Sequence, residues 1–158
     1  MVANVQIREL IDALESISTT LSDMSLALEA QREAVFTNDL SRLLYVRNEQ
    51  EGLTARLERH ERRRKQIQEH IEHELGVTGV LAIAASLPES LNFRVRLADL
   101  ASEIGRKVRA LHEHNHRSSQ LLKACIQARR FRLDQDRSYI VLAAGQRALQ
   151  PRPFDYLG

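Results

Sequence analysis

The sequence of 158 residues predicts an all-α fold, and three observations carry that prediction. The chain is rich in Ala, Leu, Glu, Arg and Gln, the residues that favour long helices. It has only six Gly and three Pro, whereas a many-stranded sandwich or barrel needs turn residues about every 8–12 positions. Its apolar residues recur at steps of three and four. We therefore expect an elongated antiparallel helical bundle, or coiled coil, of three long helices with a short helix and a C-terminal tail.

The first long helix is predicted from Ile7 to Val35. Its apolar residues alternate between steps of three and four, and Gln31 fills the one position that the pattern skips. This spacing places a narrow apolar seam along one side of a helix, which no strand can do. Thr37-Asn38-Asp39 then ends the pattern and offers capping residues for the next helix. The seam consists of Ile7, Leu10, Leu14, Ile17, Leu21, Met24, Leu28 and Val35.

The second long helix is predicted to run from Leu40 to Leu75, and a short helix follows it. Its middle, residues 58–66, has no aliphatic or aromatic side chain, so we expect it to project beyond its partners or to be thinly covered. Gly76 stands where a left-handed C-terminal cap is expected. The apolar residues 80–87 predict a turn or two of helix that packs across the end of the bundle.

The third long helix is expected to begin at Ser86-Leu87-Pro88, since proline suits a first helical turn. Its apolar seam has a polar gap at Asn115 and Ser118. An asparagine in a seam fixes register and partner choice at a cost in stability. The sequence leaves open whether Asn115 does this or lies partly exposed near a bundle end.

The chain changes character after Arg130, so we divide it into a helical bundle, 1–130, and an apolar, aromatic tail, 131–158. The tail holds four of the seven aromatic residues and follows no strong helical period. Interface hot spots are enriched in aromatic and arginine side chains. One interpretation is that the tail binds a partner, and the other is that it packs on its own bundle. The candidate partner-binding residues are Phe131, Arg132, Leu133, Tyr139, Ile140, Val141 and Leu142.

The net charge of +2 conceals an asymmetry, because residues 1–57 carry a net charge of −4 and residues 74–130 a net charge of +4. We interpret this asymmetry as helices of opposite net charge lying side by side, with a basic face for nucleic acid or membrane as the alternative.

The densest basic cluster of the sequence is spread around its helix and diluted by acidic neighbours, with no aromatic residue for base stacking. A solvated face is expected there, contact with an acidic partner is the alternative, and no nucleic acid is expected. This cluster consists of Arg59, Arg62, Arg63, Arg64 and Lys65, diluted by Glu58 and Glu61.

One catalytic pattern is present, since residues 112–116 (HEHNH) match the zinc-protease motif H-E-x-x-H. The common three-histidine extension would need Gly at 119 and His at 122, where this chain has Ser119 and Leu122. We expect a polar helix face there. Because no Gly-rich phosphate loop or nucleophile elbow occurs either, we predict no enzyme, no catalytic residue, no metal and no cofactor.

The single cysteine, Cys125, excludes an internal disulfide and any cysteine-based metal cluster. Within the first thirty residues, charged residues interrupt every apolar stretch before it reaches the length of a signal peptide or a membrane span. We therefore expect a soluble, cytoplasmic protein without stable membrane insertion.

The order of these elements resembles the FlgN family of flagellar export chaperones, over nearly the whole chain. A heptadic first helix comes before residues 38–44 (NDLSRLL), which open the second helix, and residues 87–89 (LPE) precede the third. The chain departs from the family pattern at residues 116–119, where the family commonly has a second Asn or a Gly. The third helix and the tail carry the remaining similar residues, Leu111, Asn115, Leu121, Leu122 and the Tyr139…Gly145 pairing.

This resemblance implies a non-enzymatic cytoplasmic chaperone that binds the C-terminal segments of hook-filament junction (hook-associated) proteins. It would keep them unpaired and deliver them to the flagellar type III export gate and ATPase components. In the family much of the client contact lies in the C-terminal region, which maps here to the segment from Phe131 through Leu142. Two alternatives are a structural coiled-coil component or adaptor of a secretion apparatus, and a zinc hydrolase that uses His112, Glu113 and His116.

Overall fold

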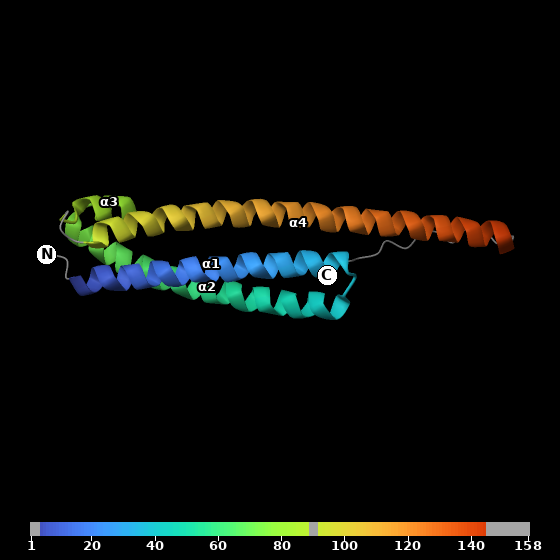
Figure 1. Cartoon of the computed structure of the whole chain (residues 1–158), viewed down its shortest axis with the longest axis horizontal. Helices are drawn as coiled ribbons and strands as arrows, with labels where there is room; N and C mark the ends of the chain where they lie inside the picture. The colour runs from blue at the N-terminus through green and yellow to red at the C-terminus, as the bar shows by residue number, and fades with distance from the viewer. Residues whose placement is uncertain (1–3, 89–91, 145–158) are drawn as a thin grey trace. The chain divides into compact units, whose positions relative to one another are not determined.

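The structure, a computed structural model, describes residues 4–88 and 92–144, with side chains for all of them except residues 129 and 131–144. The prediction of an all-α fold is confirmed, because this part of the chain forms four helices and no strand. The helices are α1 (Asn4–Phe36), α2 (Leu40–Leu75), α3 (Val80–Ser86) and α4 (Asn92–Ala144), coloured in chain order in Figure 1.

The helix boundaries follow the predicted caps at α2. The backbone N–H of Arg42 donates a hydrogen bond of 2.9 Å to a side-chain oxygen of Asp39, the residue that caps the start of α2. Asn38, just before it, has a φ of 54°, a left-handed conformation that asparagine tolerates. Gly76 ends α2 in the predicted left-handed conformation, with a φ of 67°. Short polar and glycine signals therefore set both ends of this helix.

The start of α4 differs from the prediction. Pro88 lies outside the helices, and α4 begins at Asn92. Leu87, the residue before the proline, is extended with φ −81° and ψ 147°. Proline disfavours helical geometry in the residue that precedes it, so it ends the short helix α3 here and does not open the long one.

The chain divides into two units, residues 1–116 and 117–158, and α4 passes from one to the other. The backbone of α4 also continues through Arg130, where the bundle was expected to end, and stays helical to Ala144. Residues 145–158 of the predicted tail lie outside the described residues.

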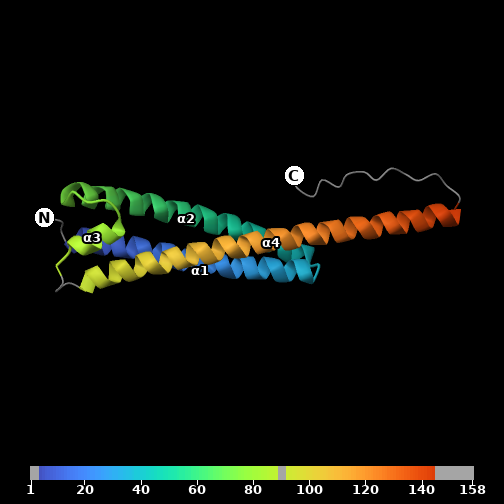
Figure 2. The same ribbon diagram turned by 90° about the horizontal axis from the view of Figure 1, so that it is seen from above.

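The core of the first unit lies at the end where α3 connects α2 to α4. All four helices contribute, and Figures 1 and 2 show α3 at the end where α1 begins and α2 ends. Buried apolar packing of this kind is the main source of stability for helices in water. The buried residues of this core are Ile7, Leu10, Ile11, Leu14, Ile71, Ile83, Ala84, Leu87, Leu97 and Leu100.

A second, smaller apolar cluster joins α1 to α2 farther along, where the two helices run antiparallel (Figure 2). It consists of Ala27, Val46 and Leu53, with Met24 and Ala30 packed against it. The predicted α1 seam is therefore buried from Ile7 to Leu21 and again at Leu28, while Met24 and Val35 are half-buried.

A polar cluster that the seam pattern did not predict joins α1 to the first part of α4. Ser18 is only 4% exposed, and its hydroxyl donates a hydrogen bond of 2.7 Å to Oε1 of Glu103. The ammonium of Lys107 donates to the same hydroxyl at 2.7 Å and pairs with Glu103 at 2.8 Å. Lys107 and Ser18 hold the pKa of the Glu103 carboxyl below its usual value, with Lys107 the larger influence.

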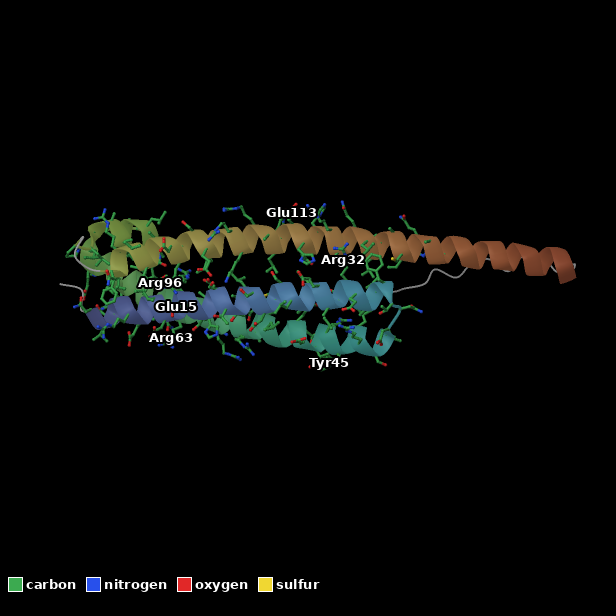
Figure 3. All side chains as sticks on the ribbon, in the orientation of Figure 1. Glu15, Arg32, Tyr45, Arg63, Arg96 and Glu113 are labelled. Carbon is green, nitrogen blue, oxygen red and sulfur yellow. The ribbon has the colours of Figure 1, made fainter. Side chains whose placement is uncertain are left out.

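A salt bridge of 2.6 Å between Arg96 and Glu15 (labelled in Figure 3) joins the same pair of helices and raises the pKa of Arg96.

Candidate protein-binding surfaces

The predicted binding residues lie in the last part of α4. The backbone there is helical, and the side chains of Phe131, Arg132, Leu133, Tyr139, Ile140, Val141 and Leu142 lie outside those that the structure describes. Their role in binding therefore stays a prediction. Among the residues with described side chains, the turn between α1 and α2 in the first unit carries a candidate binding surface.

Large apolar side chains are left uncovered at this turn, and we call Phe36, Leu40, Leu44 and Tyr45 the hairpin patch. They are 62%, 67%, 54% and 69% exposed, respectively. In Figure 3, Tyr45 lies on the outer side of α2, away from α1. Within its first two turns α2 buries only Val46, so Leu40 and Leu44 are not used in the core of the first unit.

The backbone that carries the hairpin patch is held in place by polar contacts. Arg42 forms a salt bridge of 2.9 Å with Glu33 across the turn, and Gln50 donates a hydrogen bond of 2.9 Å to Gln31. The guanidinium of Arg32 stacks over the ring of Phe36, with 5.6 Å between its central carbon and the ring centroid. Exposed aromatic and arginine side chains on a fixed backbone have the composition of an interface hot spot.

The predicted basic cluster is not uniform. Arg64 is half-buried and donates hydrogen bonds of 2.9 and 3.1 Å to Glu61 and a further one to Gln68. Lys65 pairs with Glu69 at 3.8 Å. Arg59, Arg62 and Arg63 are exposed and form no salt bridge within the part of the chain that the structure describes. Acidic neighbours therefore pair with two of the five cations of this cluster, and the solvated face predicted for the cluster stays a prediction.

The polar face between α2 and α3 is also ordered. One carboxylate oxygen of Glu72 accepts hydrogen bonds from the Gln68 side chain at 2.6 Å and from the backbone N–H of Gly79 at 2.7 Å. These two donors, Gln68 above all, lower the pKa of Glu72 below its usual value. Glu72 thus holds the loop after α2, a structural role that the histidine- and glutamate-rich sequence did not reveal.

The H-E-x-x-H motif falls on α4, where His112, Glu113 and His116 are exposed. No three His, Cys, Asp or Glu side chains gather in a group suited to a metal ion among the described residues. Asn115 is exposed, which agrees with the interpretation of a residue outside the core. The buried hydroxyl of Ser118 has no hydrogen-bond partner among the described residues. Cys125 is half-buried.

Comparison with family models, curated proteins and solved structures gives no match for this chain. Within residues 4–88 and 92–144, no helix has a stretch that is both long and apolar enough to cross a membrane.

Proposed function

We propose that this chain is a cytoplasmic export chaperone of the flagellum, which binds hook-filament junction proteins through their C-terminal segments. It keeps these clients unpaired and delivers them to the type III export gate and ATPase components. In this proposal the first 130 residues form an elongated antiparallel bundle, the segment from Phe131 through Leu142 makes the main client contact, and the chain has no enzymatic activity.

The observation that carries the binding part of this proposal is the hairpin patch. Four large apolar side chains are more than half exposed on a helical scaffold whose turn is held by a salt bridge and a capped helix. Large apolar side chains that are exposed near one another on a protein surface are typical of sites where another protein packs. The flagellar identity of the client rests on the resemblance of the sequence to the FlgN family.

The physical chemistry of the clients suits such a surface. Helical segments that assemble as coiled coils expose an apolar seam when they are unpaired, and they self-associate through it. A chaperone that covers this seam replaces the missing helix. Because the client must become ordered on binding, part of the interaction free energy is spent on that ordering, so affinity is moderate and release is easy.

The proposal is tested by titration calorimetry of the full chain against the C-terminal segment of a hook-filament junction protein. Two double variants, Tyr139→Ser/Ile140→Ser and Leu40→Ser/Leu44→Ser, separate the predicted segment from the hairpin patch. The matched control is Val95→Ser, which removes an apolar side chain that is 63% exposed on α4. We expect each double variant to weaken binding by about tenfold, as for loss of a hot-spot contact, and the control to bind like the native chain.

Failure of the native, folded chain to bind the client segment would overturn the proposal. The alternative is a structural coiled-coil component or adaptor of a secretion apparatus, which the hairpin patch also favours because two copies can cover it. That function predicts an oligomer of fixed size in light scattering at all protein concentrations, lost in Leu40→Ser/Leu44→Ser. The chaperone predicts client binding without such a fixed oligomer.

A further inference from the structure

The outer side of α2 carries three arginines that form no salt bridge with a carboxylate of the described residues. We call Arg59, Arg62 and Arg63 the arginine face. They are exposed, and residues three and four apart on a helix are neighbours on its surface, so the three guanidinium groups lie on one side. Figure 3 shows Arg63 reaching outward from α2.

Most acidic residues of the same part of α2 contact groups other than these three arginines. Of the carboxylates between residues 58 and 74, only Glu58 has no partner among the described residues, and although it lies four positions before Arg62, the two form no salt bridge. The others are held by neighbours along the helix or by the loop after it, so the arginine face keeps its charge. These held pairs are Glu61 with Arg64, Glu69 with Lys65, Glu72 with Gln68 and Gly79, and Glu74 with His70.

We propose that the arginine face binds an acidic helix of another protein. A guanidinium group presents its donors in a planar fork that matches a carboxylate and forms two parallel hydrogen bonds with it. Glutamates three or four positions apart on a partner helix would repeat the spacing of Arg59, Arg62 and Arg63. This inference does not depend on the proposed function, because it involves neither the hairpin patch nor the segment from Phe131 through Leu142.

The surroundings favour a protein over a nucleic acid or a membrane. The sequence has no Phe, Tyr or Trp between 46 and 92, so the arginine face lacks the aromatic side chains on which single-strand-binding proteins stack successive bases. Among the described residues 46–80 there is no strongly exposed large apolar side chain that could enter a lipid bilayer.

The test uses the full chain and a labelled, end-capped helical peptide of three EAAEAAA repeats, with a QAAQAAA peptide as its neutral counterpart. Fluorescence anisotropy at low and high salt measures binding. The variant Arg59→Glu/Arg63→Glu is compared with Arg106→Glu/Arg109→Glu, which makes the same change of charge at two exposed arginines of α4. We expect the native chain to prefer the glutamate peptide, the α2 variant to bind it at least about tenfold more weakly, and the control to stay within about twofold.

Three results would overturn the proposal: no preference of the native chain for the glutamate peptide, equal loss in both variants, or unchanged binding in the α2 variant. Tighter binding of a DNA duplex or of phosphatidylserine vesicles than of the glutamate peptide would also overturn it and identify the other class of partner. Thermal unfolding of both variants, followed by circular dichroism, verifies that the helices are retained.

Discussion

Replacing Ser18 with alanine should destabilise the first unit by about 1 kcal/mol. The Ser18 hydroxyl donates to Glu103 and accepts from Lys107, each at 2.7 Å, and Lys107 also donates to the Ser18 carbonyl at 3.1 Å. A hydrogen bond to a charged group contributes about 1.5–3 kcal/mol when the groups are dry. The Glu103 and Lys107 side chains are 34% and 30% exposed, so water partly replaces the lost contacts and the expected effect is at the lower end.

The matched control is Ser16→Ala on the same helix. The Ser16 hydroxyl donates only to the carbonyl of Asp12 in its own helix, at 2.8 Å, so its loss does not affect the contact between α1 and α4. Both substitutions change helix propensity equally, so the difference between their free energies of unfolding gives the contribution of the polar cluster.

The assay is urea unfolding followed by circular dichroism at neutral pH, with a double-mutant cycle between Ser18→Ala and Lys107→Met. We expect a coupling free energy of about 0.5–1 kcal/mol.

The reasoning fails if Ser18→Ala and Ser16→Ala unfold at the same urea concentration, or if the cycle is additive. In that case the cluster would add nothing to stability, and the pairing of α1 with α4 would rest on the apolar core and the salt bridge between Arg96 and Glu15. A changed slope of the unfolding transition in Ser18→Ala would instead show that the substitution alters the unfolded chain or the cooperativity.

Three further predictions follow from the core, the glycines and the carboxylates. Leu97 is fully buried, so Leu97→Ala should destabilise the chain by about 3 kcal/mol in urea unfolding; a loss below that of a surface substitution would contradict the packing. Gly76→Ala should cost about 1 kcal/mol because of the left-handed backbone, whereas Gly52→Ala, in the interior of α2 with open space around the added carbon, should stabilise by about 0.5–1 kcal/mol. The pKa values of Glu72 and Glu103 are depressed in the folded chain, so their contribution is complete above a pH of about 4.5 and is lost as the pH falls through the folded pKa values. Urea midpoints between neutral and acidic pH should therefore fall less steeply for Glu72→Gln/Glu103→Gln, and equal slopes would refute the assignment.

The features that depend on local chemistry could be predicted from the sequence. The alternation of three and four steps identified the buried side of α1, because that spacing determines which side chains share a helix face. The caps at Asp39 and Gly76 could be predicted because each depends on a few consecutive residues. Pro88 was assigned to the wrong helix, since proline both suits a helix start and ends the helix before it, and the sequence alone does not decide between the two effects.

The features that depend on which helix covers which face could not be predicted. Leu40 and Leu44 look like the opening of an apolar seam, yet they are exposed because no element of the first unit lies over them. Ser18 looks like a polar interruption, yet it is buried because α4 brings a lysine and a glutamate to it. The sequence also did not predict that Arg59, Arg62 and Arg63 form no salt bridge. It shows which carboxylates are near in the chain, but not which cation each carboxylate contacts.

The hairpin patch, at the end of α1 and the start of α2, does not overlap the arginine face, which lies farther along α2. Tyr45, the last residue of the hairpin patch, and Arg59, the first of the arginine face, are fourteen positions apart on α2, which is about 21 Å along a helix. An apolar client segment and an acidic helix can therefore be held at the same time. Because one surface binds by apolar burial and the other by charge, salt should release the acidic helix and leave the client bound.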